Sequence, residues 1–300
     1  MQRLVAALLL CLSFGLACAQ TGVQPVASGQ AAEELLASLR FQRGGITLPG
    51  AVATLDLPAS FRYLAPADTA RLLEQGWGNP PGLRTLGMIV PSGASPLGAG
   101  GWGVVITYDP GGHVLEGDAA GIDYAMLLEA IKESMAQENR VRRKQGYPAM
   151  TLVGWAERPY YDAAGHKLYW AKELHTEGAP VNGLNYSVRV LGRDGVLVLN
   201  AVAGIGQLEQ VRSEMRKVAA FTHFTPGRRY ADFHPGADRV AGYGIAALVT
   251  GGVAARLGLS DKLPALATPL AAILLALATL VLVSLAWQLF RRGRGLSLGR

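Results

Sequence analysis

Cysteine is nearly absent from this sequence of 300 residues, and both copies, Cys11 and Cys18, fall within the first 19 residues. Those residues have the composition of a secretory signal, so the exported chain is expected to contain no cysteine. This excludes a disulfide framework, a cysteine-ligated zinc site and a cysteine nucleophile from the exported part. The absence of free thiols suits an oxidising compartment.

Charge is also scarce, because charged residues make up 17% of the chain while hydrophobic residues make up 50%. The apolar fraction is large enough for a substantial core. The formal net charge of +6 comes from the two ends. Of the 28 basic residues, one is Arg3 and four lie in the last ten residues, which leaves 23 against 22 acidic residues. The rest of the chain is almost neutral, and no nucleic-acid partner is expected.

Several catalytic signatures are missing as well. The sequence has no His-Glu-x-x-His helix and no serine in a Gly-x-Ser-x-Gly elbow. A glycine-rich run at 98–103 precedes a predicted strand, so it lacks the strand–loop–helix order of a phosphate-binding loop. These patterns imply no cofactor and no metal ion.

The first 19 residues predict a secretory signal peptide. A basic residue is followed by a short apolar stretch at 4–16, and Ala17-Cys18-Ala19 places small residues where a signal peptidase recognises them. Cleavage is expected before Gln20. One alternative is an uncleaved anchor, for which the apolar stretch is short. The other is lipoprotein processing at the cysteine, where Gly15 occupies a position usually held by leucine.

A long uncharged run near the C-terminus predicts a transmembrane helix. Lys262 and Arg291 enclose 28 residues without a charge, and a bilayer core needs about 20 helical residues. Arginines follow at once, so the C-terminus is expected in the cytoplasm. The signal peptide places the mature N-terminus outside. Both features agree on a single-pass protein of the bacterial inner membrane, with the lipid bilayer as a partner. The alternative for the uncharged run is a buried core helix.

The two ends define a predicted domain organisation. It comprises a signal peptide (1–19), a linker (20–32), a periplasmic domain (33–238), a Gly/Ala-rich juxtamembrane segment (239–262), a transmembrane helix (263–290) and a basic cytoplasmic tail (291–300). Within 240–255, small residues recur at four-residue spacing, a pattern that lets membrane helices approach closely. Three alternatives are left for the structure of this segment: an interfacial or re-entrant helix, a buried helix of the soluble domain, or a second membrane span.

Hydrophobic periodicity in the exported part predicts the α+β class, an antiparallel sheet with packed helices. Helices are expected at 33–40, 66–75, 122–144 and 208–218. One or two short strands are expected within 46–57, and further strands at 86–90, 102–108, 151–156, 166–175, 184–190 and 196–203. Residues 109–112 are expected to turn the chain into a short strand at 113–115, and 159–165 to form a loop. The strand at 184–190 alternates, so one face is expected to be exposed, whereas 196–203 is apolar on both faces and is expected to be central.

Few polar residues stand out as candidates for catalysis. His175 and Glu173 lie two apart on one predicted strand, so they share a face and could form a base with its orienting carboxylate, or half of a metal site. His166 lies near a predicted turn. The alternative for all three is an exposed strand face with charge pairs. Asp118 and Asp123 flank the start of the longest predicted helix, where a cap or dipole role is expected and cation binding is the alternative.

Aromatic residues give a second set of candidates. Tyr160 and Tyr161 lie in a predicted loop, and Trp170 follows Tyr169 on a predicted strand. Neighbouring side chains on a strand point to opposite faces, so Tyr169 and Trp170 cannot both be buried on one side. Because interfaces favour Trp and Tyr, these residues could bind another envelope protein. The alternative is an ordinary core under a second layer of helices.

Several long runs resemble a bacterial family of predicted membrane-anchored proteins that carry domain of unknown function 2167. The matching runs are 61–82, 86–91, 121–128, 153–174, 184–203 and 229–255, which cover most of the chain between the signal peptide and the terminal helix. The resemblance implies the envelope topology described above and no known reaction, and it assigns no catalytic residue.

The sequence therefore predicts a binding or structural module of the envelope that is not an enzyme. The alternative is an unrecognised hydrolase or metal-dependent enzyme that uses His175 and Glu173.

Overall fold

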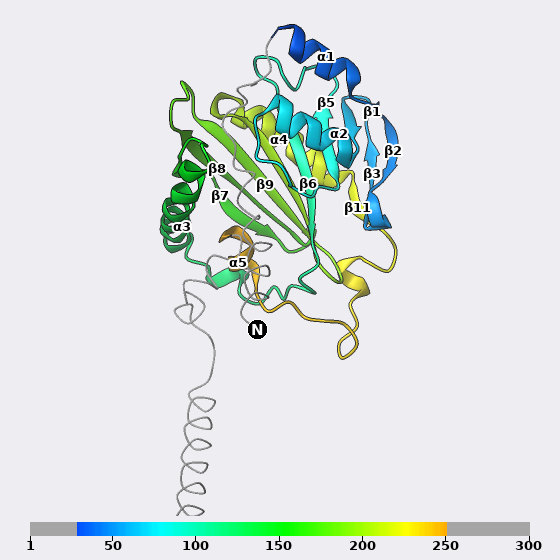
Figure 1. The fold of residues 1–300 in the computed structure, drawn as a ribbon. Coiled ribbons are helices and arrows are strands. Elements are labelled where there is room, and N and C mark those ends of the chain that lie inside the picture. The colour runs from blue at the N-terminus through cyan, green and yellow to red at the C-terminus, as the bar shows by residue number, and fades with distance from the viewer. Residues whose placement is uncertain (1–28, 251–300) are drawn as a thin grey trace, which may run out of the picture. The chain divides into compact units, whose positions relative to one another are not determined.

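An eight-stranded antiparallel sheet forms the centre of the fold, so the predicted α+β class is confirmed (Figure 1). The computed structural model describes residues 29–250. In sheet order the strands are β1 (Phe41–Gln42), β4 (Phe61–Leu64), β5 (Gly87–Pro91), β6 (Gly103–Asp109), β10 (Val196–Gly204), β9 (Gly183–Leu191), β8 (Lys167–Thr176) and β7 (Met150–Asp162). A smaller sheet has the order β11 (Thr222–Phe224), β3 (Ala53–Leu57) and β2 (Gly44–Thr47).

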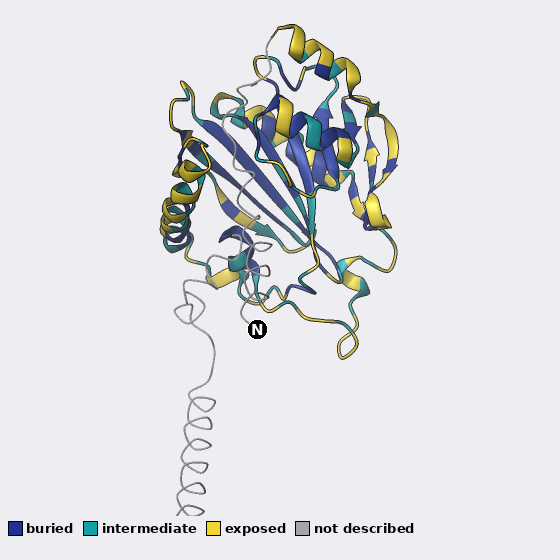
Figure 2. Ribbon diagram, viewed as in Figure 1, coloured by how far each residue is buried: buried dark blue, intermediate teal, exposed yellow. Residues whose placement is uncertain are grey.

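One face of the main sheet packs on helix α4 (Leu208–Ala220) and the smaller sheet. Tyr186 and Leu199 from the main sheet meet Val211 and Met215 of α4 in one apolar core. β10 lies between β6 and β9, as expected for a strand that is apolar on both faces. The α4 side is therefore an ordinary hydrophobic core, and Figure 2 shows that the strands in the middle of the main sheet consist mostly of buried residues.

The opposite face is covered by different helices at its two ends (Figure 1). Helices α1 (Gln30–Ser38) and α2 (Pro66–Arg71), with a π-helical turn that continues α2 (Leu72–Gly76), cover β4 to β6 through a second apolar cluster. Helix α3 (Tyr124–Lys144) packs beside the edge strand β7. Between these helices lies the middle of the sheet face, formed by β8, β9 and β10.

Helix α3 shows how local sequence determines an element. Asp123 caps its N-terminus, because the side chain accepts hydrogen bonds from the backbone N–H groups of Ala125 and Met126 at 2.9 and 3.0 Å. Leu127 and Ile131 lie one turn apart and are buried. The predicted helix at 122–144 is confirmed to within two residues.

Two local predictions are wrong. Residues 113–115 do not form a hairpin strand after β6; His113 instead makes an isolated parallel bridge with Val240. Residues 159–162 are not a loop, because β7 continues to Asp162 through irregularities in its pairing with β8. β7 lies at the edge of the sheet, where proline and bulges are tolerated. Tyr160 and Tyr161 therefore lie on a strand.

Smaller differences concern the ends of the described region. Helix α1 begins at Gln30, three residues before the predicted start. Helix α5 (Ile245–Thr250) falls in the predicted juxtamembrane segment. Within residues 29–250, no helix combines the length and apolar character that a membrane span requires. The predicted signal peptide, transmembrane helix and basic tail lie outside the described residues.

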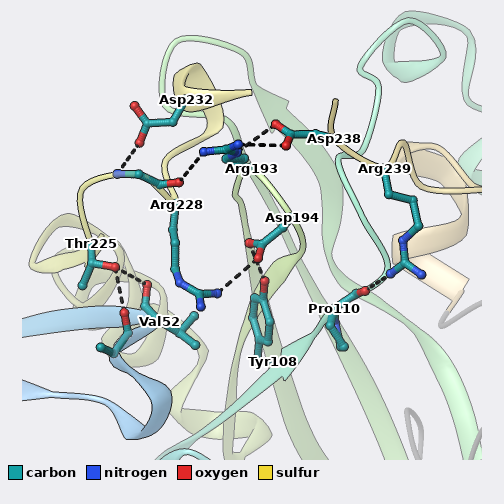
Figure 3. Close-up of polar contacts among 12 residues, drawn as sticks. Val52, Tyr108, Pro110, Arg193, Asp194, Thr225, Arg228, Asp232, Asp238 and Arg239 are labelled. Carbon is teal, nitrogen blue, oxygen red and sulfur yellow. Dashed lines mark hydrogen bonds and ion pairs between the residues drawn. The ribbon is translucent and has the colours of Figure 1, made fainter. Parts of the chain in front are cut away.

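After β11, residues 225–243 run across one end of the main sheet, and we call them the strap. Arg193, at the turn between β9 and β10, donates from Nε and Nη2 to the two carboxylate oxygens of Asp238, each at 2.8 Å (Figure 3). Asp194 accepts from Arg228 at 3.1 Å and from the Tyr108 hydroxyl at 2.8 Å. These paired contacts hold the strap against the sheet.

Candidate functional site

Four rings from three parts of the chain stack where the strap meets the sheet. The ring centroid of Tyr230 lies 4.1 Å from that of His166 and 4.2 Å from that of His113. His113 in turn stacks on Phe233 at 3.8 Å. We call these residues the ring stack. It joins the loop after β6, the β7–β8 turn and the strap.

Glu116 brings a carboxylate to the ring stack. His166 Nδ1 lies 2.6 Å from Glu116 Oε1, and the Tyr161 hydroxyl donates to the same oxygen. Both partners of the His166–Glu116 pair are partly buried. A histidine oriented by a carboxylate is one half of an acid–base arrangement. His166 and Tyr161, predicted for different roles, thus lie together, and the sequence analysis missed Glu116.

His113 is the buried member of the ring stack. It is 4% exposed, and its Nδ1 has no hydrogen-bond partner within residues 29–250. Burial lowers the pKa of His113, although the backbone of Gly192 and Arg193 and the charges of Glu116 and Asp238 act in the opposite direction. The neutral imidazole is therefore the form that the fold favours.

The predicted pair of His175 and Glu173 is connected through a third residue. His175 Nδ1 lies 3.0 Å from Asn182 Oδ1, and Asn182 Nδ2 donates to Glu173 Oε1 at 2.7 Å. The two side chains share a face of β8, but an amide separates the imidazole from the carboxylate. Glu173 consequently does not orient His175 directly, and His166 has the closer carboxylate.

The predicted aromatic candidates lie on opposite faces of the sheet. Tyr160 is 38% exposed and stacks on Tyr169 of the α4 side with ring centroids 5.0 Å apart. Trp170 is 1% exposed and lies on the other face. As expected from strand geometry, Tyr169 and Trp170 are buried on different sides.

Trp170 lies within a row of polar side chains on the middle of the sheet. Alternate residues of β9, beginning at Leu184, point to the α4 core. The residues between them point to the opposite face. With neighbours on β8 and β10 they form what we call the polar face: Trp170, Lys172, Asn185, Ser187, Arg189 and Asn200. Helix α4 packs on β9 and β10 from the other side, whereas α5 (Ile245–Thr250) packs against α3 on the side of the polar face (Figure 1).

Hydrogen bonds organise the centre of the polar face. The Ser187 hydroxyl lies 2.7 Å from Asn200 Oδ1 and 3.3 Å from Asn185 Oδ1. Asn185 and Ser187 are each 2% exposed, so the prediction that this side of the strand is exposed is wrong. Because the Asn200 amide oxygen faces the hydroxyl, its amide nitrogen points elsewhere.

Two cations flank this centre. Lys172 is 6% exposed, and burial lowers its pKa to about 8, aided by the nearby charge of Arg189 and opposed by Glu138 of α3. Burial also lowers the pKa of Arg189 to about 10, opposed by Asp109 and Tyr243. The polar face thus holds two positive charges in surroundings that disfavour charge.

Two donors of the polar face have no hydrogen-bond partner in the part of the chain that the structure describes. They are the buried Nε1 of Trp170 and the buried Nη1 of Arg189, whose guanidinium carbon lies 4.7 Å from the Trp170 ring centroid. Trp77 and Trp155 donate from Nε1 to backbone carbonyls at 3.0 and 3.1 Å, whereas the buried Nε1 of Trp102, in the α4 core, also has no partner within residues 29–250. Buried donors normally have partners, so the polar face is suited to receive acceptor oxygens.

Residues 29–250 contain no group of three or more His, Cys, Asp or Glu side chains placed to hold a metal ion.

Comparison with known proteins gives one family and several distantly similar structures, two of which are described below. A family model described as "Protein of unknown function (DUF2167)" matches residues 40–282, which include both the ring stack and the polar face. No curated protein matches the chain. The solution structure of cyanobacterial PsbP (CyanoP) from Synechocystis is 13% identical, with a TM-score of 0.33, covering 63% of this chain and 94% of that one. The crystal structure of the Saccharomyces cerevisiae Ran-binding protein Mog1p is 11% identical, with a TM-score of 0.31, covering 66% and 100%.

Proposed function

This chain belongs to the DUF2167 family of proteins of unknown function, and from that premise we propose that it is a non-enzymatic binding module of the bacterial cell envelope. In this proposal the α+β domain is exported to the periplasm. A helix over residues 263–290 holds it at the inner membrane. The polar face, whose side chains are mostly buried, is the site that binds the ligand or partner.

The observation that carries the binding role is the chemistry of the polar face. A sheet face that serves only as core is expected to be apolar, because burying a polar group without a partner costs about 1–3 kcal/mol. Here Lys172 and Arg189 are held in surroundings that disfavour their charge, and Trp170 has a buried donor without a partner in the described residues. A bound molecule with acceptor oxygens would offset these costs.

The envelope location is supported by the ends of the sequence. A signal-like segment at 1–19, an uncharged run at 263–290 and the arginines that follow it agree on one orientation. The near absence of cysteine is compatible with export.

Photo-crosslinking in intact cells tests the binding role. A photoreactive amino acid would replace Val198, which alternates with Asn200 on the polar-face side of β10 and is partly buried. A matched probe would replace Ser213 on the exposed side of α4. A third, at Tyr160, samples the aromatic surface predicted from the sequence. The proposal requires a discrete adduct from Val198 that the probe at Ser213 does not give. The same adducts from both positions, or none from Val198 under several growth conditions, would contradict it.

The contact between His166 and Glu116 favours a second candidate function, an envelope hydrolase. His166 would act as a base oriented by Glu116, in place of the predicted pair of His175 and Glu173. The purified full chain would be assayed against ester and phosphoester substrates. This function requires a turnover that His166→Ala abolishes and His175→Ala retains. Activity that survives His166→Ala, or no turnover of any substrate, would count against it.

A further inference from the structure

We propose that the polar face binds a phosphoryl group, held between Lys172 and Arg189 above Ser187. This inference rests on the proposed binding function and adds to it the chemical class of the ligand. The phosphoryl group can belong to a small soluble phosphate or to a phospholipid headgroup, and both offer the same oxygens to this face.

The spacing of the two cations suits one shared group. Lys172 is paired in register with Asn185, and Arg189 lies four residues further along β9. Four residues of a strand span about 13 Å, with Ser187 at the midpoint. Lysine and arginine have long side chains, so both can reach a group above Ser187. The charge of Arg189 also lowers the pKa of Lys172, as expected for two cations on the same face of neighbouring strands.

The donors match a phosphoryl group better than a neutral polar ligand. The Nε1 of Trp170 and the Nη1 of Arg189, both unpartnered within residues 29–250, need acceptors. The Asn200 amide adds a further donor, because its oxygen faces Ser187. A phosphoryl group offers several charged acceptor oxygens, and guanidinium groups bind such oxygens in a bidentate manner. A group of this kind satisfies the donors and compensates both cations together.

Two acidic residues, Asp109 and Glu138, lie near the cations. Asp109 lies near Arg189, but its Oδ2 accepts a hydrogen bond from the Tyr243 hydroxyl at 2.7 Å. Glu138 of α3 raises the pKa of Lys172, yet the net shift of that pKa is still downward. Burial likewise outweighs the charge of Asp109 in its effect on the pKa of Arg189. The effect of burial on both pKa values is therefore larger than that of the nearby carboxylates.

Calorimetric titration of the full chain in a nonionic detergent tests the charge requirement. Inorganic phosphate and glycerol 3-phosphate are the probes, with acetate and glycerol for comparison. We expect Lys172→Met and Arg189→Gln each to weaken phosphate binding at least tenfold. Arg216→Gln, which removes an exposed cation from α4, should leave it unchanged. Equal binding by all three variants, or equal affinity for glycerol, would overturn the proposal.

A measurement on the unaltered protein covers the case in which a variant fails to fold. The indole N–H resonance of Trp170, assigned with Trp170→Phe, should shift downfield on addition of phosphate as it gains an acceptor. Trp102 Nε1 is also buried without a partner in the described residues, but it belongs to the α4 core, so its resonance should stay in place. Phosphate binding that leaves the Trp170 resonance unmoved would place the phosphate elsewhere and overturn the inference.

Competition identifies the source of the phosphoryl group. Phosphatidylglycerol vesicles that displace glycerol 3-phosphate would indicate a lipid headgroup, and vesicles that do not would indicate a soluble phosphate; either result supports the inference. If no phosphate binds at millimolar concentration while the Val198 adduct persists, the phosphoryl site is wrong and the proposed binding function is retained. If the adduct is missing as well, both fall.

Discussion

Lys172 lies where the fold opposes its charge, and this makes a prediction about stability. Its pKa falls to about 8 in the folded protein, against 10.5 in an unfolded chain. Between these values the unfolded state binds more protons, so the free energy of unfolding should rise with pH across this window. Below pH 8 the lysine is charged in the folded state, and the full cost of burying that charge then destabilises the fold. The pKa shift corresponds to a loss of at most about 3 kcal/mol in the free energy of unfolding.

Lys172→Met should therefore raise the free energy of unfolding near pH 7 by as much as about 3 kcal/mol, measured by urea denaturation without phosphate. The gain should shrink as the pH approaches 10.5, because the wild-type lysine then loses its charge in both states. Lys132→Met, at a position of α3 with an exposed ion pair, is the control and should change stability by less than about 1 kcal/mol. A loss of stability in Lys172→Met at pH 7 would show that the lysine is already compensated.

His113 leads to a second prediction at the scale of one residue. Burial lowers its pKa in the folded state. The unfolded state therefore takes up a proton at a higher pH than the folded state, and stability should decrease as the pH falls below about 6.5. His113→Phe keeps a ring in the ring stack and removes the titration, so its denaturation midpoint should vary less with pH over the range from about 7 to about 5.

The control for His113 is His223, an exposed residue 4.0 Å from Asp56. His223→Gln should retain the loss of stability that the wild type shows on acidification. Parallel pH profiles for His113→Phe and the wild type would mean that the imidazole is not held neutral.

At the scale of elements, the loop after β6 depends on a close approach to the strap. His113 N–H donates to Arg239 O, and Ala241 N–H donates to His113 O, each at 2.8 Å. Gly112 has φ of 108°, and a Cβ there would lie 2.7 Å from Arg239 O. Gly112→Ala should lower the free energy of unfolding by about 2 kcal/mol, through backbone strain and separation of the two segments.

Gly117 in the same loop provides a matched control for this substitution. A Cβ there would meet nothing within 4 Å, and its φ lies outside the left-handed region. Gly117→Ala should change stability by less than about 0.5 kcal/mol in the same urea titration. Equal effects of the two substitutions would show that the contact with the strap contributes little.

Elements with a strong local signal were predictable from the sequence. Helix α3 has apolar residues at helical spacing and a capping aspartate, and β10 is apolar on both faces. The segment after β6 was not predictable, because its turn signal is local whereas the partner of His113 is Val240, far along the chain. Pro159 suggested a loop, but β7 is an edge strand that accommodates it.

The candidate site was predictable only in part, for a related reason. Strand alternation placed Asn185, Ser187 and Arg189 on one face, but the sequence could not show that this face is buried. Trp170 was singled out from the sequence without its neighbours, and its role in binding stays a prediction. The carboxylate that meets His166 belongs to Glu116, and no local pattern connects positions so far apart. Long-range packing decides which polar residues meet.

At the scale of the whole molecule, the strap joins the two candidate sites to the segment that precedes the predicted anchor. It carries Tyr230 and Phe233 of the ring stack, and Tyr243 donates to Asp109 near the polar face. Asp118, from the loop after β6, accepts from the backbone N–H groups of Ile245 and Ala246 at the start of α5. A ligand on the polar face would therefore lie on the same packed unit that leads towards residues 251–300.

The predicted topology can be tested on the whole molecule. A helix of about 20 apolar residues is stable in a bilayer because its backbone groups are satisfied internally, and arginines resist translocation. The full chain should stay in the membrane fraction after an alkaline wash, and a chain ending at Asp261 should be released by osmotic shock. A fluorescent protein that folds only in the cytoplasm should be active when fused after Arg300, and alkaline phosphatase should be inactive there. An active phosphatase fusion, or full chain lost in the wash, would contradict a single-pass anchor and leave the domain without the envelope position on which its proposed function depends.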